Sequence, residues 1–376
     1  MECCSRCGTV VLPVKREVVG MPRGVTAKRR GKSDILRAHT MHEIAIVLYS
    51  GARPAVVHGL TDLFEVANRI SAEQGETSSR VEVMVSHWGT NPSLGLTRTY
   101  ESHPGKHGKP DCIIFPPTLE VQQNAESTQR LLAWAKAEHV AGTTLCSVCG
   151  GTFLLAQLGL LNGRPATTHW SYANLLAITF PEICVQSDDL IIDLGDVVTA
   201  GGMMAWLDLG LKLVERYLGP LVMIKTAQFF LVDPAARQQR YYANFSPRLQ
   251  HGDDAILRVQ VSIESSVSEA VSVGEMASTA RLGERTFLRR FQKATGLTPT
   301  EYAQSIRVQK ARELLEMTAL SVKEVARNVS YEDVGAFRKI FQKSVGLQPS
   351  EYRKRFRAPS GVSNIQMPVR SYPIST

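Results

Sequence analysis

One short helical pattern occurs twice in the last third of this chain, 50 residues apart. Each copy contains a pair of phenylalanines one helical turn apart, followed by the motif Gly-x-x-Pro-x-x-Tyr. The shared residues are Phe287, Phe291 and the motif 296–302 in the first copy, and Phe337, Phe341 and the motif 346–352 in the second. Similarity at a fixed spacing indicates two copies of one supersecondary unit. The pattern therefore predicts two equivalent helical lobes near the C-terminus.

Each copy has the pattern of a helix-turn-helix. A first helix opens with Glu, an apolar residue and Ala, at 275–277 and again at 324–326. A short break near 281–283 or 329–331 then leads into the helix that carries the phenylalanines. The small Ala lets the two helices cross closely, and the turn orients the second helix so that its outer face can enter a DNA groove. The repeated unit therefore predicts a DNA-binding domain.

The outer face of each second helix carries basic side chains between the buried phenylalanines. Arginine can donate two hydrogen bonds to O6 and N7 of guanine, and both Arg and Lys neutralise phosphate. For a single Arg, a solvated helix face is an equally good interpretation, whereas repetition of the whole unit favours DNA binding. The side chains that we expect to contact DNA are Arg285, Thr286 and Arg289 in the first copy, and Arg338 and Lys339 in the second.

On these motifs, residues 256–358 resemble the DNA-binding domain of AraC-type transcription regulators, and the Gly-x-x-Pro-x-x-Tyr motif is the most specific part of the resemblance. The family has two helix-turn-helix units held by one long helix, which we expect here at Pro299–Met317. The family's usual Gly-Phe at the start of the second recognition segment is Ser330-Tyr331 in this chain. Ser tolerates a positive φ less well than Gly, so this departure bears on the geometry of that turn and leaves the fold intact.

Length and charge agree with one DNA-binding end and one further domain. With 376 residues, 44% of them hydrophobic, the chain can build two cores and is too long for one ordinary domain. Residues 251–358 contain 18 Lys and Arg against 13 Asp and Glu, whereas residues 41–250 contain 15 against 19. Basic charge thus accompanies the repeat, as expected when only that end of the chain meets phosphate.

Cysteine usage and hydropathy indicate the compartment. Seven cysteines spread over a chain without a signal peptide favour a reducing compartment over a disulfide framework. No apolar run approaches the length that spans a bilayer, so we predict a cytoplasmic protein without a membrane partner. Cys4 and Cys7 form a Cys-x-x-Cys without a second pair at zinc-finger spacing, and we predict neither a metal nor a cofactor.

The chain is predicted to have five segments. Residues 1–40 are basic and show neither structural period, so we expect a disordered extension. Met41 directly precedes the first credible strand and is expected to be the physiological start of translation. The remaining segments are an α/β sensor domain at 41–235, a polar linker at 236–255, the helical DNA-binding domain at 256–358 and a disordered tail at 359–376.

Between Glu43 and the linker, short apolar runs alternate with helical segments. Strands are expected at 44–49, 81–86, 112–115, 143–148 and in a hairpin of 190–194 with 197–200, and helices at 60–70, 128–138, 152–158 and 203–218. Strands separated by helices imply a parallel sheet covered on both faces. We therefore predict an α/β flavodoxin-like domain followed by an all-α double helix-turn-helix domain.

Residues 143–152 predict a strand, a sharp turn and a helix, with Cys149 at the turn. A residue at such an elbow has a strained backbone and projects its side chain over the carboxyl edge of the sheet, where ligands of open α/β folds bind. Small neighbours such as Gly150 would leave backbone N–H groups free for an anion, and the helix start is expected to lower the pKa of the Cys149 thiol. The structural alternative is a buried Cys used as a small apolar residue, which suits Cys146 better; a redox pair of these two cysteines is a further alternative.

The elbow Cys149-Gly150-Gly151 and the later run 159–170 resemble the PfpI-like branch of the class I glutamine amidotransferase superfamily. The resemblance covers about 41–232 and is closest to the version fused to an AraC-type domain in GlxA-like regulators. Its most specific motif is Ala-Thr-Thr-His-Trp at 166–170. In enzymatic relatives the elbow cysteine is the nucleophile and the histidine lies nearby, which implies these positions for Cys149 and His169.

Two departures from the enzymatic pattern argue against catalysis. The acid position of the family falls near Val56, which has no carboxylate. The loop that supplies an oxyanion donor is Pro116-Pro117-Thr118, and proline has no N–H to offer. A thiol without its proton partner and with a weakened oxyanion hole lacks the groups that contribute most to acyl chemistry. We therefore regard Cys149 and His169 as a vestigial catalytic pair and predict that the protein is not an enzyme.

The same region suits a small ligand, because it offers a few polar groups beside apolar and aromatic surface. The predicted ligand-binding residues are Cys149, Gly150, Thr168, His169, Trp170, His58 and Asp62. His169 has the alternative of being a core histidine, and the ring of Trp170 could accept a cation. The resemblance implies a sensor of small nitrogenous metabolites such as amino acids or quaternary amines.

The sequence thus predicts a transcription regulator whose partners are the double-stranded DNA of a promoter operator, a small effector and a second copy of the chain, with RNA polymerase as a further candidate. Two alternatives use Cys149: a cysteine-dependent hydrolase or deglycase, and a thiol redox sensor. The identity of the effector, the target genes and the direction of regulation are not encoded in any pattern we recognise.

Overall fold

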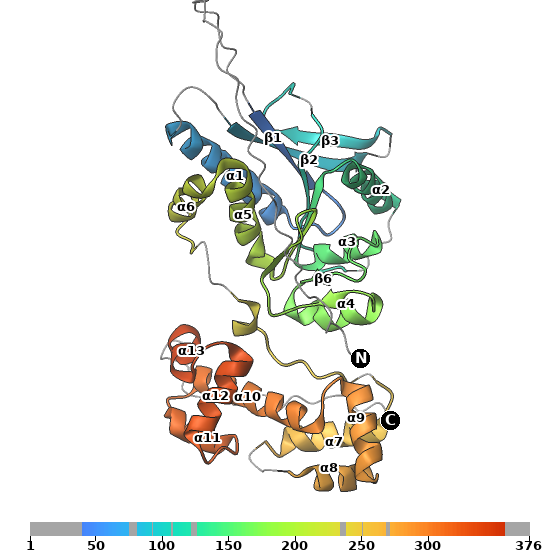
Figure 1. The fold of residues 1–376 in the computed structure, drawn as a ribbon, viewed down its shortest axis with the longest axis vertical. Helices are drawn as coiled ribbons and strands as arrows, with labels where there is room; N and C mark the ends of the chain where they lie inside the picture. Colours follow the sequence, from blue (N-terminus) through green and yellow to red (C-terminus); the bar gives the residue numbers. More distant parts are fainter. Residues whose placement is uncertain are drawn as a thin grey trace, which may run out of the picture. The chain divides into compact units, whose positions relative to one another are not determined.

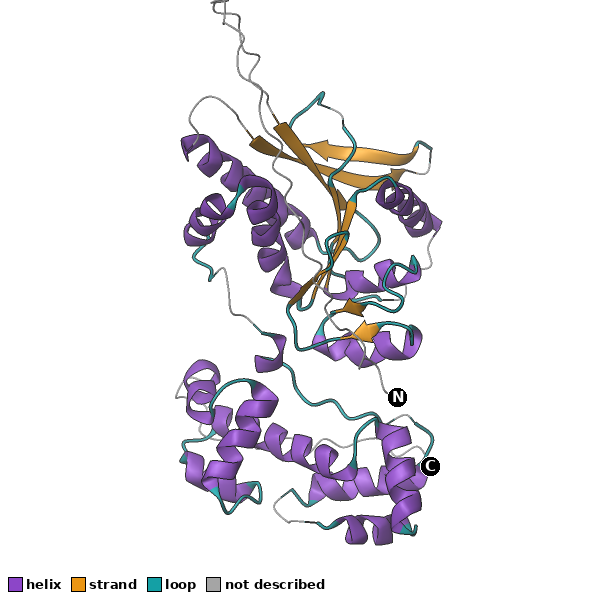
Figure 2. Ribbon diagram, in the orientation of Figure 1, coloured by secondary structure: helices purple, strands orange, loops and turns teal. Residues whose placement is uncertain are grey.

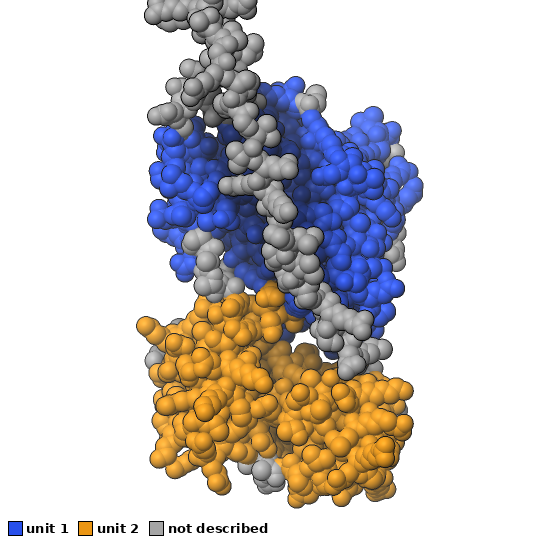
Figure 3. Space-filling view, viewed as in Figure 1, with its two compact units in different colours: residues 1–186, 190–237 blue, residues 187–189, 238–376 orange. Residues whose placement is uncertain are grey.

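The computed structural model describes residues 40–74, 81–91, 93–106, 108–121, 126–233, 238–249, 251–267 and 271–357. The chain divides into two compact units (Figure 3). The first comprises residues up to 186 together with 190–237, and the second comprises 187–189 and the chain from 238 onward. Apart from Thr40, the predicted extension 1–40, with Cys4 and Cys7, lies outside the described residues, as does the predicted tail 359–376.

The first unit is built on a seven-stranded sheet with the order β3-β2-β1-β4-β5-β9-β8 (Figure 2). The five inner strands run parallel, and the edge strands β3 and β8 run antiparallel to their neighbours. The strands are β1 (Thr40–Val47), β2 (Val81–Asn91), β3 (Gly95–Glu101), β4 (Cys112–Phe115), β5 (Thr144–Val148), β8 (Ile191–Asp193) and β9 (Val197–Ala200). A separate two-stranded sheet pairs β6 (Pro165–Ala166) with β7 (Cys184–Val185).

Helices cover both faces of the large sheet (Figure 1). One face packs against α1 (Pro54–Gln74), α5 (Trp206–Leu218) and α6 (Pro220–Phe229), and the other against α2 (Glu126–Val140), α3 (Thr152–Gln157) and α4 (Ala173–Thr179). Because successive side chains of a strand point to opposite faces, Ile44 and Ile46 of β1 join the first core, while Ala45 and Val47 join the second. A strand buried on both sides must be apolar throughout, which explains the continuous apolar run.

The predicted α/β fold is confirmed, but the strands β3, β6 and β7 and the helices α4 and α6 were not predicted. Strand β3 contains Thr, Arg and Glu and pairs only with β2 at the sheet edge, so no apolar alternation marks it. Helix α6 leaves Leu221 and Ile224 exposed, so its apolar residues do not form the single stripe that identifies an amphipathic helix.

The second unit is helical, and its long helix α10 connects two three-helix groups (Figure 1). The helices are α7 (Asp254–Ser265), α8 (Val273–Ala280), α9 (Glu284–Thr295), α10 (Pro299–Met317), α11 (Val322–Asn328), α12 (Val334–Val345) and α13 (Pro349–Phe356). The predicted bounds of α10 are those observed. Thr298 and Glu301 form a reciprocal capping box, and Pro299 occupies the first turn, so the sequence defines this start sharply.

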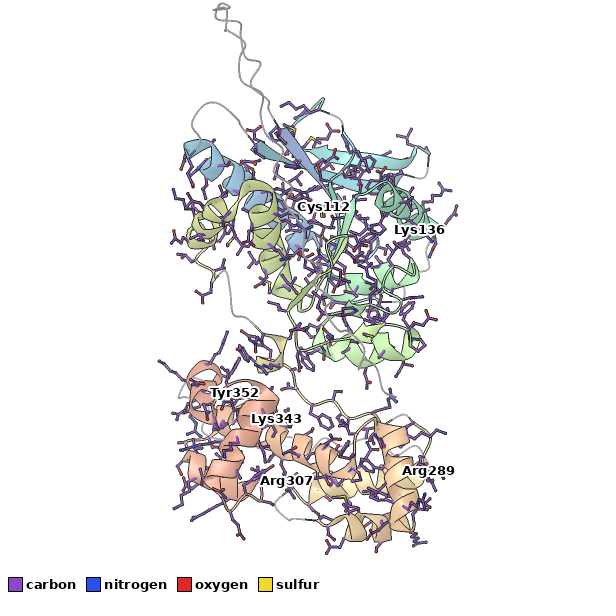
Figure 4. All side chains as sticks on the ribbon, viewed as in Figure 1. Cys112, Lys136, Arg289, Arg307, Lys343 and Tyr352 are labelled. Carbon is purple, nitrogen blue, oxygen red and sulfur yellow. The ribbon has the colours of Figure 1, made fainter. Side chains whose placement is uncertain are left out.

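The repeated Gly-x-x-Pro-x-x-Tyr motif has the same structural role in both lobes. Gly296 and Gly346 end α9 and α12 in the left-handed region, with φ of 81° and 86°, which residues other than Gly adopt at a cost. The tyrosine that follows is buried against the second phenylalanine of its lobe. The ring centroids of Phe291 and Tyr302 are 5.5 Å apart, as are those of Phe341 and Tyr352 (Figure 4).

Residues 240–245, predicted to be part of a polar linker, lie against the second unit. Arg312 of α10 is 4% exposed and donates through Nη2 to the carbonyl oxygen of Arg240 at 2.8 Å. The rings of Phe245 and Tyr302 are 5.2 Å apart. A Cβ on Gly346 would lie 2.7 Å from Tyr241 Cε1, so this glycine is needed for the close approach of the segment. Among the described helices, none is both long and apolar enough to cross a membrane.

Candidate functional site

The carboxyl end of β5 forms a strained elbow. Cys149 follows the strand directly, starts a short 3-10 helix (Cys149–Gly151) and has a φ of 56°, which is rare for a residue with a side chain. The 3-10 helix leads into α3 without a break. The predicted strand, sharp turn and helix are therefore present, and the strain is located at the predicted residue. Strained non-glycine residues of this kind cluster at functional positions.

The glycines after Cys149 are required by packing. A Cβ on Gly150 would lie 2.4 Å from the carbonyl oxygen of Thr118, and one on Gly151 would lie 2.6 Å from that of Phe115. Both distances are shorter than real Cβ contacts, so the backbone after β4 can pass the elbow only where side chains are missing. The sequence suggested that these glycines expose backbone N–H groups, whereas the structure explains them by this close approach.

The thiol of Cys149 is in an apolar environment. Burial raises its pKa to about 11, and a backbone hydrogen bond from Gly150 lowers it by less. The prediction that the helix start lowers the thiol pKa is therefore wrong, because the loss of solvent outweighs the favourable backbone field. Val56, at the acid position, is buried in the same apolar cluster. At neutral pH the sulfur is a thiol and a weak nucleophile.

The other cysteine of the proposed redox pair faces elsewhere. Sγ of Cys146 lies 3.3 Å from Sγ of Cys112, on the neighbouring strand β4 (Figure 4), and both residues are fully buried. This supports the interpretation of Cys146 as a core residue. Within the described part of the chain, no three His, Cys, Asp or Glu side chains are grouped so that they could hold a metal ion.

The motif 166–170 is tied to the elbow through hydroxyl groups. Thr168 is fully buried, and its Oγ1 donates to the carbonyl oxygen of Cys149 at 2.8 Å. Oγ1 of Thr152 donates to the carbonyl oxygen of Thr167 at 3.0 Å, and the Thr167 N–H donates to Oγ1 of Thr199 at 2.9 Å. The run of threonines therefore fixes the loop before His169 relative to the elbow.

His169 caps the next turn of the chain. Its Nδ1 accepts the backbone N–H of Ser171 at 3.2 Å and lies 2.7 Å from the hydroxyl of Ser171. The ring is half-buried beside Trp170 and Tyr172, with centroid distances of 5.2 and 5.8 Å, and burial lowers its pKa. The imidazole is thus neutral at pH 7, with Nδ1 as an acceptor.

Three residues that were not predicted to belong to the site contact the loop 116–119 next to Cys149, two through their side chains and one through its backbone. Tyr49 is buried and donates its hydroxyl to the carbonyl oxygen of Pro116, and the hydroxyl of Tyr172 donates to that of Leu119 at 3.5 Å. The backbone N–H of Arg53 donates to the carbonyl oxygen of Pro117 at 3.0 Å.

The pKa values of Tyr49 and Tyr172 reflect two neighbouring groups, the thiol of Cys149 and the guanidinium of Arg53. Burial, followed by the proximity of Cys149, raises the pKa values of Tyr49 and Tyr172, while the guanidinium of Arg53 lowers both. Nε of Arg53 donates to the carbonyl oxygen of Gly51 at 3.2 Å. Among the described residues, no carboxylate forms an ion pair with this guanidinium, so it can receive an anionic group.

The second unit presents two exposed basic helix faces. In α9, Phe287 and Phe291 are buried, whereas Arg285, Thr286 and Arg289 are exposed. Arg289 is labelled in Figure 4. In α12, Phe337 and Phe341 are buried, whereas Arg338 and Lys339 are exposed. All five predicted DNA-contacting side chains therefore face solvent on the second helix of their unit. Arg290 instead pairs with Asp253, the N-cap of α7, at 2.7 and 2.9 Å.

The turn of the second helix-turn-helix contains the expected strained residue. Ser330 has a φ of 61°, so Ser adopts the conformation for which the related family uses Gly. Its Oγ donates to the carbonyl oxygen of Val267 at 3.1 Å, which offsets part of the backbone strain. Arg281 has a φ of 56° at the corresponding turn of the first unit. Each turn therefore places a residue with a side chain in the left-handed region.

Comparison with known proteins gives the family of each unit. Residues 276–355 match a family of helix-turn-helix domains, and residues 95–216 match the DJ-1/PfpI family. The chain joins a DJ-1/PfpI domain to an AraC-type helix-turn-helix domain. It is 28% identical to the HTH-type transcriptional regulator CdhR of Pseudomonas aeruginosa over 213 residues, which are 56% of this chain and 63% of that protein.

Further similarities cover smaller shares of the chain. The HTH-type transcriptional regulator GlxA of Rhizobium meliloti is 27% identical over 52% of this chain and 60% of that protein. An isonitrile hydratase of Pseudomonas putida is 33% identical over 37% of this chain and 56% of that enzyme. The DNA-binding domain of AdpA, solved in complex with a target DNA, is 31% identical over 27% of this chain and 92% of that chain, with a TM-score of 0.27. The chain thus covers about three-fifths of the two regulators.

Within the DJ-1/PfpI domain, the structure brings together only some of the predicted ligand-binding residues. Cys149, Gly150, Thr168, His169 and Trp170 are connected by the contacts described above. His58 is exposed on α1 and faces His87, with 6.0 Å between ring centroids, and Asp62 is exposed one turn further along. Arg53 lies before His58 and Asp62, in the first loop after β1, and directly beside the loop 116–119. The sequence signal that could have identified Arg53 is a basic residue that follows the carboxyl end of a central strand.

Proposed function

We propose that this chain is a DNA-binding transcription regulator whose DJ-1/PfpI domain binds a small effector. The observation that carries the proposal is the pair of recognition helices, which bury equivalent phenylalanines and expose Arg285, Thr286 and Arg289 on one helix and Arg338 and Lys339 on the other. Exposed cations on such helices supply phosphate contacts and base contacts in a major groove. The similarity to proteins named as HTH-type regulators supports the same function.

We further propose that the DJ-1/PfpI domain is a sensor and not an enzyme. Its thiol is buried with a pKa of about 11, and no carboxylate stands at the acid position Val56. A small nitrogenous metabolite, such as an amino acid or a quaternary amine, suits the site around Cys149 and His169. The guanidinium of Arg53 would bind an acidic group of that effector, because charge-assisted hydrogen bonds from Arg to a carboxylate are strong and directional.

A thermal-shift screen of the full-length chain tests the sensor proposal. The probes are the common L-amino acids and their quaternary-ammonium analogues, each at millimolar concentration. A ligand that binds only the native state raises the apparent stability, by about 2.7 kcal/mol at a hundred times its Kd. We expect Arg53→Gln to abolish the shift, whereas Arg69→Gln, an exposed Arg on α1, leaves it unchanged. A full shift in Arg53→Gln would contradict the assignment of the carboxylate site.

A cysteine-dependent hydrolase is the second candidate, because Cys149 retains the left-handed elbow geometry typical of a nucleophile. Turnover of an amide or dicarbonyl substrate that is lost in Cys149→Ala would favour this candidate. Binding of DNA that is unaffected by the same substitution would favour the sensor. A homodimer, contact with RNA polymerase and a cytoplasmic location remain proposals, and analytical ultracentrifugation of the full chain would test the first of them.

A further inference from the structure

The two recognition helices share one scaffold but differ in their first turns. Superimposing the sequences on Phe287 and Phe337 aligns Glu284-Arg285-Thr286 of α9 with Val334-Gly335-Ala336 of α12. Arg285 and Thr286 are exposed and carry hydrogen-bond donors, and at the same positions Gly335 is exposed and Ala336 is half-buried. The first turn of a recognition helix is the part that reaches base edges. In α12 this turn has no polar side chain with which to read them.

The capping of the two helices adds to the difference. The N-cap of α9 is Gly283, which has no side chain to occupy the first N–H groups. The N-cap of α12 is Asp333, whose carboxylate accepts the Gly335 N–H at 2.7 Å, and the neighbouring Glu332 is exposed. The two carboxylates at the start of α12, compared with the single exposed Glu284 in the first turn of α9, repel phosphate more strongly and disfavour deep insertion of this end into a groove.

The basic side chains of α12 lie further along the helix. Arg289 of α9 aligns with Lys339, and the exposed apolar Leu288 aligns with Arg338. Lys is a point charge that neutralises phosphate without the bidentate geometry by which Arg recognises guanine. The polar positions 285, 286 and 289 of α9 align with 335, 336 and 339 of α12. Of these three positions in α12, only 339 is polar. Cations in the second turn, beside an apolar first turn, suit contacts with the DNA backbone.

We infer that α9 determines the base sequence of the operator, whereas α12 binds its own half of the site mainly through phosphates. This inference rests on the proposed DNA-binding function and deepens it. The preferred operator then has one block of defined base pairs and, about one helical turn or ~10 base pairs away, a block with little base preference. The second block contributes affinity, and the first contributes specificity.

Selection of operators from a pool of random duplexes by the full-length chain tests this inference. We expect one strongly defined block in the enriched sequences. Arg289→Gln should change the preferred base within that block, because Arg pairs with guanine and Gln with adenine. Lys339→Gln should leave the preferred sequence unchanged and weaken binding to all sequences by a similar factor, with a smaller dependence on salt. Arg258→Gln, an exposed Arg on α7, is the control with the same change in charge.

Transfer of the first turn of α9 onto α12 gives a second, independent test. In the double variant Gly335→Arg with Ala336→Thr, the weakly defined block should gain discrimination of about tenfold or more between base pairs. Two equally defined blocks for the wild-type chain, or a changed base preference in Lys339→Gln, would overturn the inference while leaving DNA binding intact. Failure to enrich any sequence would instead contradict the proposed function itself.

Discussion

Nη2 of Arg312 donates a hydrogen bond of 2.8 Å to the carbonyl oxygen of Arg240, which holds the segment before α7 against the helix that joins the two helix-turn-helix units. Nη1 of Arg312 donates to the carbonyl oxygen of Ala243, and its guanidinium lies 5.3 Å from the ring centroid of Tyr352. Burial lowers the pKa of this guanidinium, although arginine side chains remain protonated in proteins. The segment is therefore a structural part of the DNA-binding unit.

Replacement of Arg312 should destabilise that unit. Arg312→Ala removes the side-chain donor from two partly buried carbonyl groups, and a buried group left unsatisfied costs about 1–3 kcal/mol. We expect the free energy of unfolding of the helical unit to fall by about 2–4 kcal/mol, measured by urea denaturation with far-UV circular dichroism. Arg258→Ala, an exposed Arg in the same unit, should change it by less than about 0.5 kcal/mol. Equal stability of the two variants would show that the segment is not held by Arg312.

The elbow glycine predicts a second destabilised variant. In Gly150→Ala the new Cβ would lie 2.4 Å from the carbonyl oxygen of Thr118, so we expect a loss of about 2 kcal/mol or more. Gly202→Ala is the matched control, because a Cβ there meets nothing within 4 Å and its φ is −62°. All four tryptophans (Trp88, Trp134, Trp170 and Trp206) lie in the first unit, so tryptophan fluorescence reports its unfolding separately. An unchanged midpoint for Gly150→Ala would contradict the close approach.

Buried His87 predicts a dependence of stability on pH. Burial, with a smaller effect of His58, lowers the pKa of His87 from 6.5 to about 4, and its Nε2 lies 2.8 Å from Oγ1 of Thr61. The unfolded chain therefore binds a proton between pH 6.5 and 4 that the native chain does not. This contribution to stability is complete above pH 6.5 and is lost as the pH falls towards 4.

We expect the contribution of His87 to fall by about 2 kcal/mol between pH 7.5 and 5. His87→Gln lacks the titrating group. Between pH 7.5 and 5 the free energy of unfolding of this variant, followed by tryptophan fluorescence, should therefore fall by about 2 kcal/mol less than that of the wild type. Identical pH profiles for the two proteins would show that folding does not lower the pKa of His87.

The buried thiol of Cys149 should resist alkylation. With a pKa of about 11, Cys149 is almost entirely protonated at pH 7.5, and only the thiolate attacks iodoacetamide. We expect peptide mass spectrometry of the native protein to find Cys184, which is half-buried, labelled well before Cys149. Rapid labelling of Cys149 at pH 7.5 would indicate an activated thiolate and would favour the hydrolase.

Much of the architecture was predictable because local patterns agree with the tertiary structure. The bounds of β4 at Cys112–Phe115 and of α10 at Pro299–Met317 were predicted without error. Both segments have sharp physical boundaries: a short strand buried on both faces, and a helix with a proline start and a capping box. The elbow at Cys149 was predictable because two glycines directly follow an apolar strand, and glycine permits the tight turn into the next helix.

The composition of the site was less predictable, because it depends on contacts between distant segments. Arg53 and Tyr172 are 119 positions apart and meet through the loop 116–119, which no periodicity reveals. The pKa of Cys149 depends on whether burial or the helix start has the larger effect, and only the packed structure decides this. Asp62 was selected by its type and position, but it is exposed on α1 without a described contact to the elbow.

The most direct test of the account is the affinity of full-length wild type and Arg289→Ala for an operator selected from random duplexes, measured by fluorescence anisotropy at fixed salt. We expect the wild-type protein to bind this operator tightly and Arg289→Ala to bind it about five- to 150-fold more weakly, which corresponds to about 1–3 kcal/mol. Arg258→Ala should bind within about threefold of the wild type. Equal affinity of wild type and Arg289→Ala for the selected operator would contradict the assignment of α9 as the helix that reads DNA.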